Sequence, residues 1–220
     1  MLALKLKRQW YQRRCDQQVM QHFLAAALPR RSTGFLESSF LVVDLETTGL
    51  NAAEGEIASI GWVLIEKGAV QLSSAQHHLI QVKQGVGQSA VFHQIHDQQL
   101  ESAQSIQAAM AAFLAAATGR LLVFHHAELD KAFLSQACRK LYGVPLIAPV
   151  VDTLQLEKKK LINTLGHIDS GALRLFSCRQ RYGLPDYAAH DALVDAIATA
   201  ELLLALVSHR GGKVSLAELI

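Results

Sequence analysis

The order in which strand-like and helix-like segments follow one another constrains the fold of this chain more than any other feature. After an N-terminal helix-like segment come three strand-like segments, at residues 40–44, 57–66 and 69–82, and Lys67 and Gly68 form a tight hairpin turn between the last two. Helix-like and short strand-like segments then alternate towards the C-terminus. A meander followed by such alternation predicts an α/β fold with a sheet of mixed direction, covered by helices.

Apolar residues with helical spacing, interrupted by glycine or proline, mark the remaining elements. Helices are expected at residues 2–28, 106–118, 127–142, 171–182 and 189–208. Short buried strands are expected at residues 121–124 and 149–152.

Length and composition fit one globular domain with extensions. The chain has 220 residues, of which 50% are hydrophobic and 18% are charged. This balance excludes disordered and membrane-spanning classes, because no apolar run approaches the ~20 residues of a membrane span. We expect a core domain at 38–208, a basic helical extension and linker at 1–37, and a short tail at 209–220. The basic N-terminus lacks the apolar core of a signal peptide, so we expect a cytoplasmic protein without a membrane partner.

Cysteine usage and charge narrow the function classes further. Cys15, Cys138 and Cys178 form no C-x-x-C pair, so neither a disulfide framework nor a zinc site is predicted. The net charge of +2 conceals a basic segment, because residues 1–31 hold seven Lys and Arg against one acid. Such a segment is compatible with binding a polyanion, and a solvated helix with one positive face explains it equally well.

Two acids follow the first apolar run, in the stretch FLVVDLETTGL. Residues two apart in a strand project from the same face, so the carboxylates of Asp44 and Glu46 should lie side by side and repel each other. Either the strand has already ended and both acids are solvated, or a divalent cation holds them. Acids at the ends of other apolar segments favour the cation, because open α/β sheets build their sites at the carboxyl ends of strands.

Further acids and one histidine could join this pair. Asp130 lies in HHAELDKAFL, soon after an apolar strand, although an Asp near a helix start is also a common partner of the helix dipole. In HDALVD, His190 precedes Asp195 by five residues, so the two can converge only if the histidine lies at or before the first helical turn. Asp191 shares the face of Asp195 more directly, and geometry alone leaves both acids as candidate ligands.

The motifs DLETTG, HHAELD and HDALVD, in this order and at these separations, resemble the three exonuclease motifs of the DEDDh (DnaQ-like) group of 3′–5′ exonucleases. The resemblance implies a ribonuclease H-like core with a mixed five-stranded sheet. It implies that the metal ligands are Asp44, Glu46, Asp130 and Asp195. It also implies that His190 is the general base. Such an oxygen ligand set suits two divalent cations, Mg²⁺ or Mn²⁺. The implied activity is release of nucleoside 5′-monophosphates from the 3′ end of DNA or RNA.

The same resemblance assigns residues to the substrate. Leu45 and Thr47 would contact the terminal nucleotide, and His126 stands where family members commonly carry an asparagine near the substrate backbone. His93, in FHQIHDQQL, matches the histidine of another family segment. The expected partner is a nucleic acid 3′ end in single-stranded form. An RNA or short-oligonucleotide exonuclease and a non-catalytic nucleic-acid-binding subunit are the alternatives.

Contact with a DNA polymerase or a sliding clamp is a weaker expectation. Residues 208–220 follow the final expected helix and are fewer than an independent docking segment needs, so we expect an exonuclease with other partners, in repair or nucleotide turnover. The end KVSLAELI faintly resembles a clamp-binding motif, but Lys213 stands where glutamine is usual. A short amphipathic end that packs on the domain is the favoured interpretation.

Overall fold

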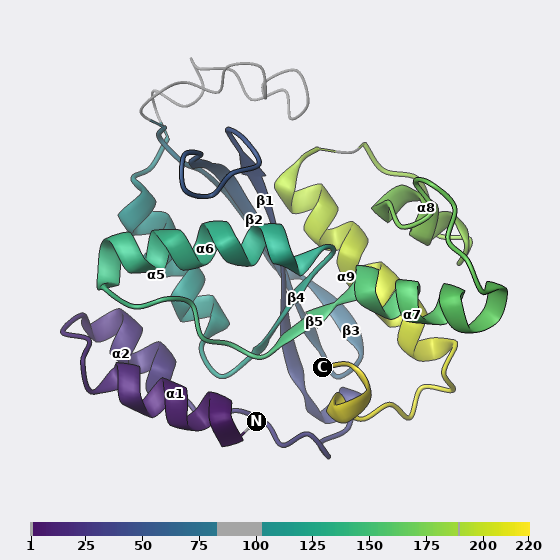
Figure 1. Ribbon diagram of the computed structural model, residues 1–220, viewed down its shortest axis with the longest axis horizontal. Coiled ribbons are helices and arrows are strands. Elements are labelled where there is room, and N and C mark those ends of the chain that lie inside the picture. Colours follow the sequence, from purple (N-terminus) through teal and green to yellow (C-terminus); the bar gives the residue numbers. More distant parts are fainter. Residues whose placement is uncertain (1, 83–102, 189) are drawn as a thin grey trace.

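A five-stranded mixed sheet forms the centre of the computed structural model, which describes residues 2–82, 103–188 and 190–220 (Figure 1). The strand order is β3-β2-β1-β4-β5. Strands β1, β2 and β3 form an antiparallel meander, and β4 and β5 extend the sheet parallel to β1. The predicted mixed sheet is therefore confirmed. The strands are β1 Ser39–Thr47, β2 Ile57–Glu66, β3 Ala69–Leu79, β4 Leu121–Phe124 and β5 Val150–Asp152.

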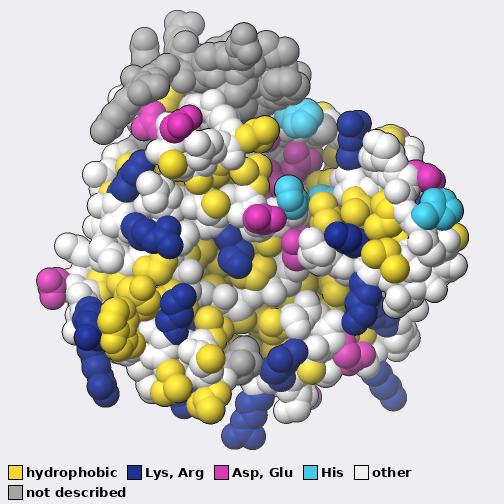
Figure 2. All heavy atoms as spheres, viewed as in Figure 1, with side chains coloured by type: hydrophobic (Ala, Val, Ile, Leu, Met, Phe, Trp, Pro, Cys, Tyr) yellow, Lys and Arg dark blue, Asp and Glu magenta, His cyan; other side chains and the backbone are white. Residues whose placement is uncertain are grey.

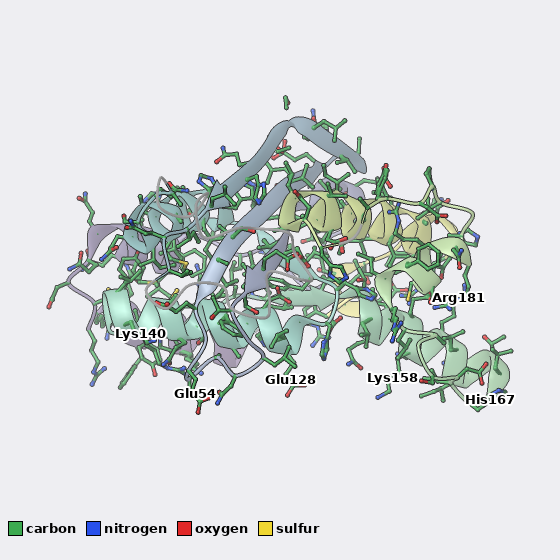
Figure 3. The ribbon with its side chains drawn as sticks, turned by 90° about the horizontal axis from the view of Figure 1, so that it is seen from above. Glu54, Glu128, Lys140, Lys158, His167 and Arg181 are labelled. Atoms are coloured by element: carbon green, nitrogen blue, oxygen red, sulfur yellow. The ribbon has the colours of Figure 1, made fainter. Side chains whose placement is uncertain are left out.

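Helices cover both faces of the sheet, and Figure 3 shows α6 and α9 on opposite sides. One face packs on α2, α5 and α6, and the other on α7, α8 and α9. Alternation along β1 sends Leu41 and Val43 into the first core and Phe40 and Val42 into the second. The helices are α1 Leu2–Gln12, α2 Gln18–Ala25, α5 Ile106–Ala117, α6 Ala127–Tyr142, α7 Thr153–Leu165, α8 Leu175–Gln180 and α9 Ala192–Ser208.

The N-terminal segment forms two helices, α1 and α2, where one helix over residues 2–28 was predicted. The chain turns between them although it contains neither Gly nor Pro there, because the turn buries Cys15 and lets α2 pack on α5. Arg8 of α1 is buried and donates hydrogen bonds to the carbonyls of Ile147, at 2.7 Å, and Phe23. Arg8 is thus a structural cation, and the free basic charge of this segment is smaller than its sequence suggests.

Other element boundaries also differ from the sequence predictions. Strand β1 continues past Asp44 to Thr47 because β2 pairs with it over that length. Helix α7 was missed, since three successive lysines interrupt its apolar pattern. The helix predicted over residues 171–182 is confined to α8, because hydrogen-bonded turns precede it.

The C-terminal tail packs on the domain, as its amphipathic pattern predicts. Val214, Leu216 and Leu219 are buried in the same core as Phe35, and the Phe35 N–H donates to the Val214 carbonyl at 2.8 Å. Leu216 could therefore reach a sliding clamp only if this core opened. Among the described helices, none is both long and apolar enough to cross a membrane.

Candidate active site

Asp44 and Glu46 lie side by side within β1, on the face that α9 covers. They pair with Gly61 and Ser59 of β2, and residues two apart in a strand share a face. Both acids are partly buried. The explanation in which the strand ends before two solvated acids is therefore wrong.

Gly61 brings α9 onto the sheet, and the sequence predictions missed it. A Cβ atom on Gly61 would lie 2.3 Å from the carbonyl carbon of Ala192 and from the nitrogen of Leu193, closer than packed atoms come. A signal was present, because a glycine inside a strand often marks a close approach of another backbone. Without a side chain at this position, the first turn of α9 can lie against the strand neighbouring Asp44.

The start of α9 separates the roles of its two acids. Asp191 caps the helix and accepts hydrogen bonds from the N–H groups of Leu193 and Val194, each at 3.0 Å. Asp195 lies one turn further on, and its Oδ2 accepts from the backbone N–H of His190 at 2.9 Å. Asp191 is therefore occupied as the helix cap, and Asp195 lies near Glu46 and His190.

Three groups meet closely enough to share one metal ion. Side-chain ligand atoms of Glu46, His190 and Asp195 all lie within 4.8 Å of one another. His190 has a positive φ of 68°, so it precedes the helix in a left-handed conformation and turns back towards Asp195. His190 and Asp195, five residues apart, can therefore meet because the histidine lies before the first helical turn.

Asp130 reaches the cluster from the first turn of α6. It is 8% exposed and hydrogen-bonds with the backbone of Leu45. Asp152, at the end of β5, fixes the start of α6 by accepting from the N–H groups of His126 and Ala127 at 3.1 and 3.0 Å. The same carboxylate caps the start of α7. Asp152 was not singled out from the sequence, and it determines where Asp130 lies.

Burial and nearby acids raise the pKa values of all four carboxyls. Burial, followed by the charges of Asp130 and Asp195, raises the pKa of Asp44 well above its ordinary value. Burial and the charge of Asp195 raise the pKa of Glu46 to about 8, and burial raises the pKa of Asp130 to about 7. Burial also raises the pKa of Asp195, against the opposing hydrogen bond from the His190 backbone. All four carboxyls therefore resist ionisation in each other's company.

The donor set fits a hard divalent cation. In the described part of the chain, the charged groups that shift the pKa of Asp44 are all acids, and the converging atoms are mainly carboxylate oxygens, the ligands that Mg²⁺ and Mn²⁺ prefer. A cation among these oxygens would favour their ionised forms and offset their repulsion. Figure 2 shows acidic and histidine side chains together near the gap between α6 and α9.

The residues expected to contact substrate lie around this cluster with different environments. Leu45 is half-buried against the opposite core. The Thr47 hydroxyl donates to the Gly49 carbonyl at 2.8 Å, which is ordinary turn chemistry. His126 is exposed, has a φ of 76° and does not cap α6 with its side chain. His93 lies outside the described residues.

A hollow of about 460 Å³ lies beside the acids, and no sequence motif predicted it. It is lined by Asp44 and Asp195 and also by Arg174, Phe176 and Tyr187. These last three come from α8 and its flanking segments, where the sequence carried no recognised pattern. The hollow joins the acid cluster to an exposed, partly aromatic surface.

A model of the exonuclease family (RNase_T, described as "Exonuclease") matches residues 41–203, which include all four acids and His190. The chain belongs to the exonuclease family. DNA polymerase III PolC-type of Thermotoga petrophila is a relative that is 32% identical over 176 residues, covering 80% of this chain. The match spans 12% of that protein's length.

Solved structures of exonucleases share the fold. Exonuclease X in complex with 5′ overhanging duplex DNA superposes with a TM-score of 0.59 at 20% identity, covering 78% of this chain and 93% of that chain. Escherichia coli Exonuclease I in complex with a dT13 oligonucleotide gives a TM-score of 0.68 at 17% identity, covering 80% of this chain and 42% of that chain. The expected ribonuclease H-like exonuclease fold is therefore confirmed.

Proposed function

We propose that this protein is a metal-dependent 3′–5′ exonuclease that releases nucleoside 5′-monophosphates from a nucleic acid 3′ end. The observation that carries the proposal is the convergence of four acids from three elements, Asp44 and Glu46 of β1, Asp130 of α6 and Asp195 of α9. Their mutual repulsion is explained by cations, and phosphodiester hydrolysis is a reaction in which cations stabilise developing charge on oxygen.

The four carboxylates would hold two ions, Mg²⁺ or Mn²⁺. When bound, such ions supply an activated water and stabilise the leaving oxygen of the displacement at phosphorus. The charges of the other three acids all raise the pKa of Asp44, so Asp44 would be among the residues that hold the ions. Asp130 and Asp195, held by the starts of two helices, complete the ligand set.

His190 is proposed as the general base. Histidine is the side chain best suited to exchange protons near neutral pH. The backbone of His190 is tied to Asp195, and its ring lies close to both Glu46 and Asp195. It is also exposed, so a water entering the site could reach it.

Single-stranded DNA is the substrate class that we propose first. The similar folds of Exonuclease I and Exonuclease X were solved with DNA. Leu45 and Thr47 flank Glu46 in β1, and His126 precedes α6. RNA and short oligonucleotides are the alternative substrates. Association with a polymerase, suggested by the names of relatives, is a separate proposal that size-exclusion chromatography of the mixed proteins tests.

The activity can be tested with 5′-labelled single-stranded and duplex DNA and RNA in Mg²⁺. A 3′–5′ exonuclease shortens these labelled strands step by step, whereas a 5′–3′ enzyme releases the labelled mononucleotide at once. Asp44→Ala should abolish shortening while the protein stays folded. Glu128→Ala is the matched control, because Glu128 lies near Asp130 on α6 but points to solvent (Figure 3). A folded Asp44→Ala protein that cleaves at the wild-type rate would refute the assignment.

A further inference from the structure

The surface beside the acid cluster carries aromatic side chains that the described cores do not use. Phe176 on α8 is 50% exposed and Tyr187 is 40% exposed. Both line the hollow that also contains Asp44 and Asp195. Figure 2 shows hydrophobic side chains gathered over α8, near the histidine and acidic side chains in the middle of the molecule. An exposed phenylalanine that joins neither core stabilises the fold little and is free to contact a ligand.

The segment that carries Phe176 has a fixed place relative to the acids. Arg179 of α8 is 3% exposed and donates to the Ala198 carbonyl of α9 at 2.6 Å. On the other side, the ring of His125 at the end of β4 bonds with the Leu173 carbonyl at 2.8 Å. Helix α8 is thereby tied both to the helix that bears the last acid and to the strand next to β1.

Two neighbours complete the surface. The Tyr187 hydroxyl donates to Glu201 at 2.9 Å, and the Arg179 guanidinium lies 4.6 Å from its ring centroid, so this ring forms a fixed wall. Arg174 is exposed and forms no ion pair within the described ranges. Asp186, which is not one of the four clustered acids, lines the same hollow as Arg174.

We propose that this hollow binds the single strand adjoining the scissile phosphate, with a base stacked on Phe176 and a phosphate held by Arg174. The inference rests on the proposed function. Aromatic platforms combined with cations bind single strands without sequence preference. Leu45 and Thr47, the proposed contacts of the terminal nucleotide, do not line the hollow, so the hollow takes nucleotides on the other side of the scissile bond.

Binding of a 5′-fluorescent dT12 strand, measured by anisotropy in Mg²⁺, tests this directly. The measurement uses the Asp44→Ala background so that the strand is not degraded. Adding Phe176→Ala should raise the Kd roughly 5- to 150-fold, the range expected for losing one base–aromatic stack, and Phe176→Trp should restore tight binding. Trp10→Ala is the control, since Trp10 is a 48% exposed aromatic on α1, away from the hollow.

The phosphate contact has its own readout. Arg174→Gln should lower the slope of log affinity against log salt by roughly 0.7, whereas Lys213→Gln in the tail should leave it unchanged. An unchanged Kd in Phe176→Ala overturns the inference. Equal weakening of dT12 and of thymidine 5′-monophosphate also overturns it, because the ring would then belong to the terminal nucleotide.

The two proposals fail separately. Wild-type cleavage combined with binding that ignores Phe176 overturns this inference alone. Binding that depends on Phe176, in a wild-type protein that cleaves none of the labelled strands, overturns the proposed function and leaves the strand-binding surface in place.

Discussion

Replacing Gly61 by alanine should separate the strand that carries the first two acids from the helix that carries the last. The added Cβ would lie 2.3 Å from the Ala192 carbonyl carbon, where ordinary contact begins at 3.4 Å. The backbones must therefore move apart by about 1 Å. Both neighbours are backbone atoms, so no side-chain rotation can relieve the clash. Because Asp195 lies in the first turn of α9, it moves with that backbone.

A displacement of this size has a large effect on rate and a moderate one on stability. Misplacing a catalytic group by 1 Å can cost about 10²-fold in rate, and overpacking a well-packed site costs about 1–3 kcal/mol of unfolding free energy. We therefore expect Gly61→Ala to remain folded at 25 °C and to cleave single-stranded DNA about 100-fold more slowly. The rate is measured by single-turnover cleavage in saturating Mg²⁺, and the stability by urea unfolding followed by circular dichroism.

Gly34→Ala is the matched control. Its Cβ would meet no heavy atom closer than 3.9 Å, its φ of −70° suits alanine, and it lies in the linker before β1. This variant should keep the wild-type rate and stability. If Gly61→Ala also kept the wild-type rate, the close contact would not be positioning Asp195, and the reasoning would be wrong.

Two further predictions concern protons. In EDTA, the free energy of unfolding should fall as pH rises from about 4.5 to about 8, because the raised pKa of Glu46 lets the folded state hold a proton that the unfolded state has released. Glu46→Gln should reduce this slope without removing it, since the pKa values of Asp44 and Asp130 are also raised. Saturating Mg²⁺ should flatten the slope, and a slope that is flat without metal would contradict the prediction. His190→Ala should lose about 10²–10⁴-fold in rate, as expected for a general base, with Mg²⁺ affinity, measured by calorimetry, nearly retained. Parallel loss of Mg²⁺ binding would instead make His190 a ligand, which its distance to Glu46 and Asp195 also permits.

The sheet and its main helices could be predicted because their signals are local. The apolar run of β2, the Lys67-Gly68 turn and the glycines that end α5 and α6 all mark their elements in the sequence. The N-terminal turn could not be predicted in this way, since it depends on long-range contacts. Buried Arg8 bonds to carbonyls 15 and 139 residues away along the chain.

The four acids could be predicted from the sequence, whereas the residues that position them could not. Asp44, Glu46, Asp130 and Asp195 stand in motifs at recognisable positions, whereas the effects of Gly61 and Asp152 appear only when separate segments meet. The aromatic surface at Phe176 had no signal, because a single exposed phenylalanine is common and acquires meaning only from the hollow beside it.

Two further acids, Asp152 and Asp191, lie next to the cluster and cap the helices that carry its members. Asp152 accepts four backbone N–H groups at the starts of α6 and α7, and Asp191 accepts two at the start of α9. These caps occupy the positive ends of the helices, which would otherwise stabilise nearby carboxylates. Asp130 and Asp195 lie in the first turns of α6 and α9 without capping them, and burial raises the pKa of each against the backbone hydrogen bonds it receives. Helix capping therefore positions Asp130 and Asp195, and in the proposed function their charge is offset by a bound cation.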